Sequence, residues 1–184
     1  MEAVDALLSR VSAPRLTGSV PASLLADMVQ AAHRAPDHAQ LSPYRFLAIT
    51  GDGRTALGEL MVAARLADAP DTDVTTLDKL RLKPLRAPMI IVGIASPTPH
   101  PKVPEIEQLL TAGIALQNMS SMAWARGFGA IWRTGDLAYS KHLQAGLGLV
   151  AHEQITGFLY IGEVEGRLKT PSKTISAELL AHWP

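Results

Sequence analysis

The chain has 184 residues, of which 47% are hydrophobic but only 5% aromatic, with 17 basic and 17 acidic residues. This length predicts a single domain over residues 1–184 that buries most of the surface its unfolded chain would expose. The zero formal charge excludes the broad basic surface of a nonspecific nucleic-acid-binding protein. The absence of cysteine excludes disulfides, thiolate nucleophiles and cysteine-based zinc sites. The N-terminal segment lacks the basic region and long apolar core of a secretory signal, so we expect a cytoplasmic protein.

The first half of the chain predicts three helices around one strand. Apolar residues repeat at helical spacing over residues 2–10, and Pro14 ends that helix. A second helix begins at Pro21 and ends before Pro36, and a strand covers residues 44–50. A third helix follows over residues 54–67. The segment 69–86 reads as a short helix with a solvated basic face, and a mobile lid beside a ligand is the alternative.

The second half is organised around a long apolar helix. A buried strand over residues 88–95 and a proline-rich crossover over residues 96–104 precede it. The helix from Glu105 is apolar or small on nearly every face as far as Trp124, which is typical of a helix buried on all sides. Gly127 is placed to end it in a left-handed turn. The remaining predicted elements are a strand at 130–134, a helix after Ser140, a strand at 155–161 and a short helix at 177–180.

This irregular order of four strands and five or six helices predicts an α+β domain. A regular alternation of strands and helices would have predicted a doubly wound parallel sheet instead. No phosphate-binding P-loop, dinucleotide fingerprint, GxSxG or HExxH motif is present. We predict no metal site, and the five-residue spacing of His33 and His38 does not match helical zinc ligands.

The notable polar residues lie at the ends of predicted elements and are mostly arginines. This pattern suits a phosphate-bearing cofactor that itself carries the reaction. Taken alone, the arginines near residue 12 fit a solvated helix end as well as an anion site. Tyr44 and Trp132 would give flat apolar contact to an aromatic ring system or simply pack in the core. The polar set is Arg10, Ser12, Arg15, Arg34, His38, Arg133 and Thr134.

Several motifs occur in a recognisable order along the chain. They are RVSAPR, RAPDHAQLSPYRF, an Ala-Gly pair inside the long helix, GFGAIWRTG and GFLYIG. Together, over about residues 4–165, they resemble the nitroreductase-like flavoproteins, and most closely the short bacterial YdjA-type branch. The resemblance implies a nitroreductase-like fold, with a mixed or antiparallel sheet of four to five strands flanked by helices. It also implies a homodimer with FMN at the subunit interface and NAD(P)H as co-substrate.

The same resemblance implies roles for individual residues. Arg10, Val11 and Ser12 match the segment that holds the FMN phosphate and ribityl chain. Arg34 and His38 match positions that reach the flavin from the partner subunit. The segment Trp132, Arg133 and Thr134 matches the one that borders the flavin and its phosphate. Catalytic side chains are not expected, because the flavin carries the chemistry.

Three further functions stay open at this stage. One is a specialised flavin dehydrogenase or dehalogenase of the same family. Another is a flavin-binding or flavin-delivery protein with negligible turnover. The last is a structural dimer without flavin, in which the arginines are surface charge. Whether Arg167 or Lys169 contacts the phosphate is also open, because the relatives with longer chains carry a late basic residue there.

Overall fold

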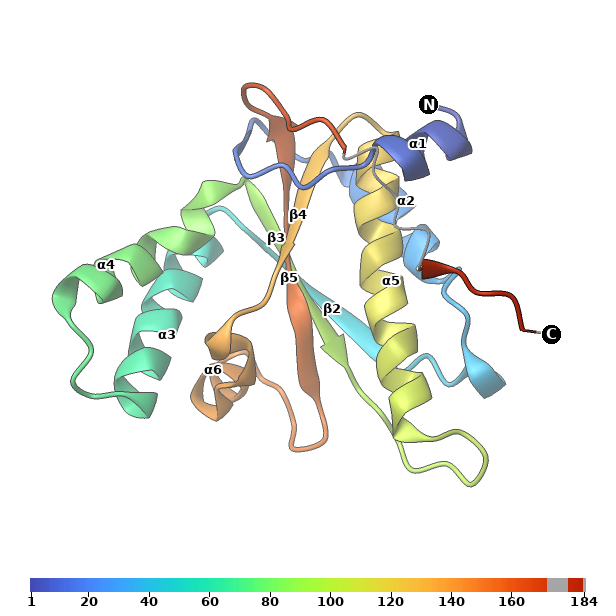
Figure 1. Ribbon diagram of the computed structural model, residues 1–184. Helices are drawn as coiled ribbons and strands as arrows, with labels where there is room; N and C mark the ends of the chain where they lie inside the picture. The colour runs from blue at the N-terminus through green and yellow to red at the C-terminus, as the bar shows by residue number, and fades with distance from the viewer. Residues whose placement is uncertain (172–178, 184) are drawn as a thin grey trace.

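The computed structural model describes residues 1–171 and 179–183 and shows an antiparallel sheet between two layers of helices (Figure 1). The order of strands is β1-β5-β3-β2, and β4 also pairs with β5. Every pair is antiparallel. The strands are β1 (Leu16–Thr17), β2 (Tyr44–Thr50), β3 (Met89–Ala95), β4 (Gly129–Arg133) and β5 (Gln154–Val164).

The centre of the sheet is formed by β3 and β5. Every residue of β3 is buried, as its continuous apolar run predicts. Its register with β5 shifts between Gly93 and Ile94, which places Thr156 in a bulge. The predicted strands are therefore confirmed. The two-residue β1 is an addition that no apolar alternation signals, because it is too short to carry a pattern.

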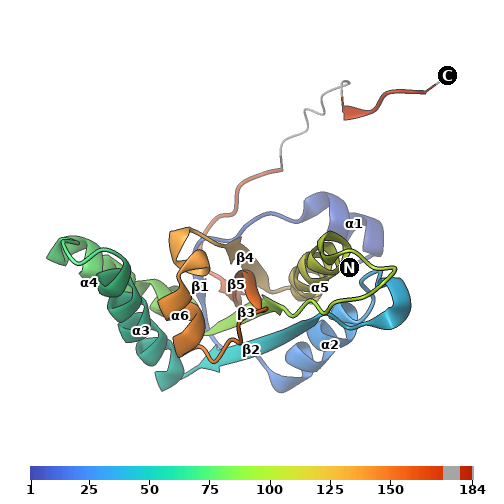
Figure 2. The ribbon, with the colours of Figure 1, turned by 90° about the horizontal axis from the view of Figure 1, so that it is seen from below.

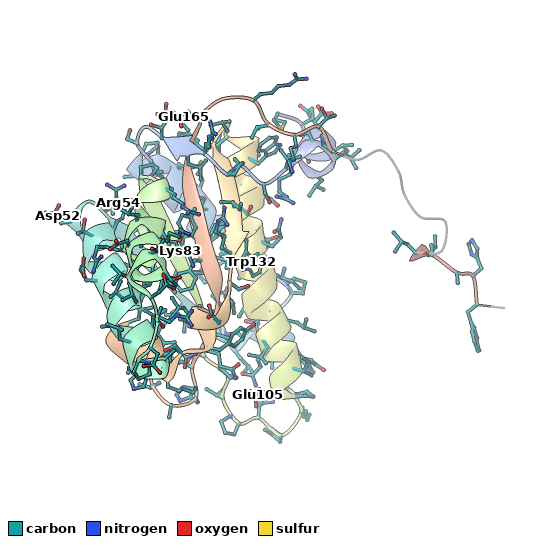
Figure 3. The ribbon with its side chains drawn as sticks, turned by 60° about the vertical axis from the view of Figure 1, so that its left-hand side comes forward. Asp52, Arg54, Lys83, Glu105, Trp132 and Glu165 are labelled. Atoms are coloured by element: carbon teal, nitrogen blue, oxygen red, sulfur yellow. The ribbon has the colours of Figure 1, made fainter. Side chains whose placement is uncertain are left out.

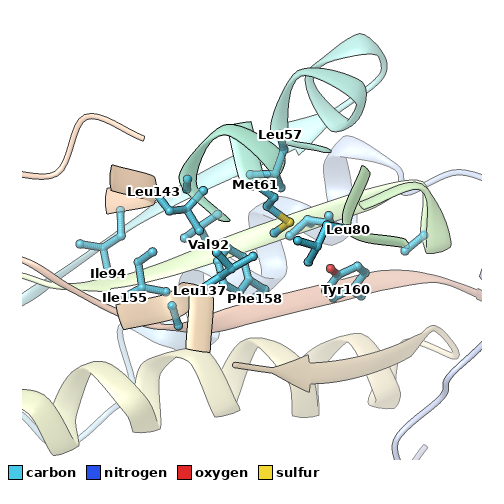
Figure 4. Packing of buried hydrophobic residues seen from close by; sticks show 14 of the residues in the cluster. Leu57, Met61, Leu80, Val92, Ile94, Leu137, Leu143, Ile155, Phe158 and Tyr160 are labelled. Carbon is cyan, nitrogen blue, oxygen red and sulfur yellow. The ribbon is translucent and has the colours of Figure 1, made fainter. Parts of the chain in front are cut away.

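The helices cover both faces of the sheet, as the view from below makes clear (Figure 2). One layer packs on a core that includes Val92, Phe158 and Tyr160 (Figure 4), and the other packs on a core that includes Ile91 and Leu159. Successive strand residues point to opposite faces, which explains this division. The first layer holds α3 (Asp52–Asp68), α4 (Val74–Leu82) and α6 (Lys141–Gly146), and the second holds α2 (Ala22–Ala32) and α5 (Glu105–Ala125), with α1 (Ala3–Ser9) beside α5.

The long helix α5 departs from its prediction on one face. Its inner side, with Ala115, Leu116 and Met119, is fully buried. Its outer side is not, because Ile106 and Leu110 are 60% and 58% exposed. The expectation of burial on all sides is wrong for this chain by itself, since the second helical layer covers only the inner side.

Short elements and turns otherwise follow their sequence signals. Gly127 has φ 84°, as a left-handed helix ending requires, and the Ser140 hydroxyl caps α6 by accepting from the Leu143 N–H. Lys83–Arg86 continues α4 as a 3-10 turn. The helix expected at 177–180 lies in part outside the described residues. Across residues 1–171 and 179–183, no helix combines the length and hydropathy that crossing a bilayer would need.

Candidate functional site

The segment after α1 lies between the end of α5 and the beginning of β4. The Ser9 hydroxyl accepts a hydrogen bond from the Trp124 indole N–H at 2.9 Å. The Ala13 N–H donates to the Ala130 carbonyl at 3.0 Å. Arg10, Val11 and Ser12 therefore run from the end of α5 to the beginning of β4, outside any helix or strand.

The last two residues of β4, Trp132 and Arg133, point to opposite faces of the sheet. Trp132 pairs with Leu159 and faces the α5 layer, and its indole N–H donates to the Thr156 carbonyl at 3.2 Å. The indole lies across Gly157 so closely that a Cβ there would be 1.9 Å from Nε1. Arg133 pairs with Phe158 and faces the opposite layer. Figure 3 shows Trp132 beside α5 and Lys83 toward α3.

A cavity of about 390 Å³ opens on the Arg133 side of β4. Its lining carries three cations, Lys83, Arg86 and Arg133, and one carboxylate, Asp136, which leaves a net charge of +2. Asp136 is already engaged, because it pairs with Arg65 of α3 and accepts from the Leu137 N–H at 3.0 Å. The remaining lining is Met61, Thr134, Gly135, Leu137, Phe158 and Tyr160.

The cavity perturbs its own ionisable groups. Burial, opposed by attraction to Asp136, lowers the pKa of Lys83. The hydrogen bond from Arg65 lowers the pKa of Asp136. Burial raises the pKa of the Tyr160 phenol, while Arg133 and Arg86 act in the opposite direction. Unpaired cations gathered over a partly buried floor create a positive potential that suits an anionic or oxygen-rich ligand.

Arg34 and His38 lie on the turn between α2 and β2, with His38 at the opposite end of α5 and Arg34 nearer Met122. His38 Nδ1 is 2.7 Å from the Glu107 carboxylate, and the Thr111 hydroxyl donates to the Pro36 carbonyl at 2.8 Å. The turn is strained, since Ala39, Gln40 and Ser42 all have φ between 48° and 63°. Non-glycine residues held in this region persist at functional sites or where the surroundings fix them.

Asp37 fixes the shape of this turn. Its carboxylate oxygens accept from the Leu41 N–H at 3.1 Å and the Ser42 N–H at 2.7 Å. A shallow cavity of about 520 Å³ lies over the turn, between Arg34 and Tyr44. Burial raises the pKa of Tyr44, whose hydroxyl is 3.2 Å from His33 Nδ1.

One chain does not bring His38 together with the Arg10 segment. The turn contacts α5 at Glu107, and the Arg10 segment contacts it at Trp124. Seventeen residues at ~1.5 Å rise put these contacts roughly 25 Å apart. Within one chain, then, Arg10 lies near the β4 segment and His38 lies at a distant second location, whereas Arg34 lies between them, in a hollow that Met122 of α5 also lines.

Sequence reasoning missed most of the charged cavity. The sequence predicts that Lys83 and Arg86 belong to a solvated basic face, yet both line the cavity. The sequence does contain one signal for these two residues, because both come just before β3, a strand that is fully buried. Tyr160 stood inside an apolar run, and nothing in that run distinguishes a core tyrosine from one that reaches a cavity.

A larger cavity, about 850 Å³, contains none of the predicted site residues. It lies between the 97–104 crossover and α6, at the end of the molecule where α5 begins. His100 Nδ1 accepts from the Lys102 and Val103 N–H groups there, so that histidine serves the fold of the crossover. Volume alone does not identify the site, and the smaller cavity beside β4 is the better candidate because several cationic side chains converge on it.

Comparisons with known proteins agree with this fold. The chain is 36% identical over 171 residues, 92% of each chain, to the Escherichia coli (strain K12) protein named "Putative NAD(P)H nitroreductase YdjA". A nitroreductase-like family protein from Bacillus cereus superposes with a TM-score of 0.82 at 23% identity, covering 100% of this chain and 96% of that one. A nitroreductase with bound FMN from Bacteroides fragilis superposes with a TM-score of 0.72 at 19% identity, with both chains fully covered.

The fold and its neighbours define an α+β protein of the nitroreductase-like class. Residues 16–163 match the nitroreductase family itself. The chain belongs to the nitroreductase family.

Proposed function

We propose that this chain is an FMN-dependent oxidoreductase that moves hydride from NADH or NADPH to nitroaromatic, quinone or similar acceptors. Family membership supports the redox class, and the name of the E. coli relative supports the co-substrate. The observation that carries the proposal is the cation-rich cavity beside Arg133 and Thr134, at the end of β4. The Arg10–Ser12 segment crosses the beginning of the same strand.

The two ends of β4 fit the two ends of FMN. Arg10 and Ser12 offer a guanidinium and a hydroxyl, which suit a phosphate dianion, and Val11 between them offers backbone. Ala130 and Thr134 are four residues apart, roughly 13 Å along a strand. That length accommodates the ribityl chain between a phosphate near Ser12 and a ring beyond it.

The cavity fits the ring end of the cofactor. Lys83, Arg86 and Arg133 supply only hydrogen-bond donors, and the pyrimidine edge of a flavin presents carbonyl oxygens. Trp132 is held by its bond to Thr156 and by Gly157, so it fixes the backbone of this strand end. Its role is to position Arg133 and Thr134 rather than to titrate.

The same site requires a second copy of the chain. His38 reaches a cofactor at Arg10 only if two α5 helices pack antiparallel, since that arrangement sets the beginning of one beside the end of the other, and we propose that Arg34 of the same turn reaches it with His38. Exposed apolar residues on α5, Ile106 and Leu110 among them, give such a homodimer an interface. We propose that each FMN lies between subunits and takes donors from both.

When bound, FMN supplies the redox chemistry, accepting a hydride equivalent from NAD(P)H and passing it to the acceptor in a ping-pong cycle. The chain's own residues bind and orient. Cations around the cavity stabilise negative charge, and a low-dielectric floor that includes Phe158 and Leu137 strengthens that effect.

The alternatives share the flavin but differ in turnover. A specialised dehydrogenase or dehalogenase of the same family would bind FMN and react with a narrower acceptor. A flavin-delivery protein would bind FMN and release it without reduction. The strained backbone from Ala39 to Ser42 favours an enzyme over a flavin-delivery protein, because strain of this kind clusters at active sites.

The decisive experiment is the anaerobic half-reaction of the purified holoprotein. We expect a yellow protein that releases FMN on denaturation, is bleached by NADPH or NADH, and recovers its colour with menadione or nitrofurazone. Colourless protein that fails to bind added FMN contradicts the proposal. Flavin that binds but is never bleached supports the delivery alternative.

A further inference from the structure

Tyr160 is a buried phenol without a hydrogen-bond partner among the described residues. It lies in the middle of β5 and is only 4% exposed, and what remains accessible faces the cavity beside β4. The part of Tyr160 that remains accessible includes its hydroxyl, which can therefore donate to water or to a ligand in this cavity.

The surroundings of Tyr160 define what the matching ligand atom must be. Arg86 and Arg133 are near enough to lower the pKa of the phenol against the effect of burial. Phe158 and Met61 complete an apolar floor, and Figure 4 shows the Tyr160 hydroxyl turned toward the helices of this layer. The phenol and both guanidiniums present donors, so the matching atom is an acceptor oxygen that carries partial or full negative charge.

We propose that Tyr160 donates a hydrogen bond to an oxygen on the pyrimidine edge of FMN. This inference rests on the proposed function, which places the phosphate near Arg10 and the ring over the cavity. The edge gains negative charge when the ring accepts hydride, so a fixed donor there stabilises the reduced cofactor more than the oxidised one. Tyr160 is thus a residue that sets the redox preference of the site as well as its affinity.

The test compares Tyr160→Phe with Tyr139→Phe in the 184-residue protein. Tyr139 is 72% exposed and lies at the other cavity, so it controls for loss of a tyrosine hydroxyl. We expect Tyr160→Phe to weaken FMN binding roughly 2- to 12-fold in a fluorescence titration, the range for one net hydrogen bond. The midpoint potential should also fall, by about 30 mV for each tenfold loss of preference for the reduced form. Tyr139→Phe should change neither quantity.

The outcomes separate the inference from the proposed function. Wild-type protein that does not bind FMN sinks both. Wild-type protein that binds FMN while Tyr160→Phe keeps the same affinity and potential overturns the inference alone. An effect of Tyr160→Phe confined to acceptor kinetics also overturns it.

A measurement on the wild-type protein covers the case in which the variant does not fold. The chain has three tyrosines, and their ionisation can be followed by ultraviolet difference titration with and without FMN. A phenol that donates to the cofactor is held protonated, so FMN should raise the ionisation pH of one tyrosine. Superimposable titrations with and without FMN would refute the hydrogen bond.

Discussion

Replacing Leu110 on the outer face of α5 by glutamate tests the proposed interface at its centre. Leu110 is 58% exposed in the single chain. Full burial of a leucine side chain stabilises by about 1.5–3 kcal/mol, so burying the exposed part contributes roughly 0.9–1.7 kcal/mol per subunit. A two-fold axis counts the residue twice, which gives about 1.7–3.5 kcal/mol per dimer. Leu110→Glu loses this contribution and also places two carboxylates in an apolar contact.

The dissociation constant should therefore rise at least roughly 20- to 300-fold, which sedimentation velocity over a dilution series resolves. Leu82 on α4 has the same exposure, 58%, but lies in the other helical layer, so Leu82→Glu is the matched control. Thermal melting of each variant checks that the subunit is folded. A wild-type monomer at micromolar concentration, or an undiminished dimer in Leu110→Glu, would refute the reasoning.

Three other changes follow from local contacts. Gly157→Ala forces a Cβ to 1.9 Å from Trp132 Nε1, and urea unfolding should show a loss of about 1–3 kcal/mol typical of overpacking; an unchanged midpoint would contradict the close packing. The Arg45 hydrogen bond holds the pKa of Glu153 at about 2, below its ordinary 4.5, so this carboxylate stabilises the fold above pH 4.5 and loses that effect as the pH falls toward 2. Glu153→Gln should remove about 2–3 kcal/mol at neutral pH and flatten the acid limb of the stability curve, whereas an identical acid limb would exclude this pair as its source. Arg10→Ala should weaken FMN binding by about 1.5–3 kcal/mol in a titration, and unchanged affinity would remove Arg10 from the site.

Local patterns predicted the elements well, for identifiable physical reasons. The spacing of apolar residues and the helix-ending residues Pro14, Pro36 and Gly127 are local signals that act over a few residues. The predicted helix and strand positions therefore agree with the structure to within a few residues. As the sequence predicts, α5 carries apolar residues on both its inner and its outer side. Its outer face, however, has no cover within the chain, because a sequence does not distinguish burial by its own sheet from burial by a second copy.

The charged cavity could not be predicted from sequence patterns, for a different reason. Lys83, Asp136 and Tyr160 come from three elements separated by at least twenty residues each, and the pairing of β5 with both β3 and β4 brings them to one place. Arg65 belongs to the same cluster through its ion pair with Asp136. Arg133 and Thr134, which belong to a sequence motif, indicated the position of the cavity but not the charge of its lining.

The proposal that each FMN lies between two subunits is tested most directly by complementation. A heterodimer is assembled from one Arg10→Ala subunit and one Arg34→Ala subunit, each carrying a different affinity tag. If the site takes Arg10 from one subunit and Arg34 from its partner, one of the two sites in this heterodimer is intact and the other lacks both arginines. We predict one FMN per heterodimer at wild-type affinity, while each parent homodimer binds weakly at both sites. A heterodimer in which both sites stay weak would show that Arg10 and Arg34 do not serve one shared site, and the account would fail.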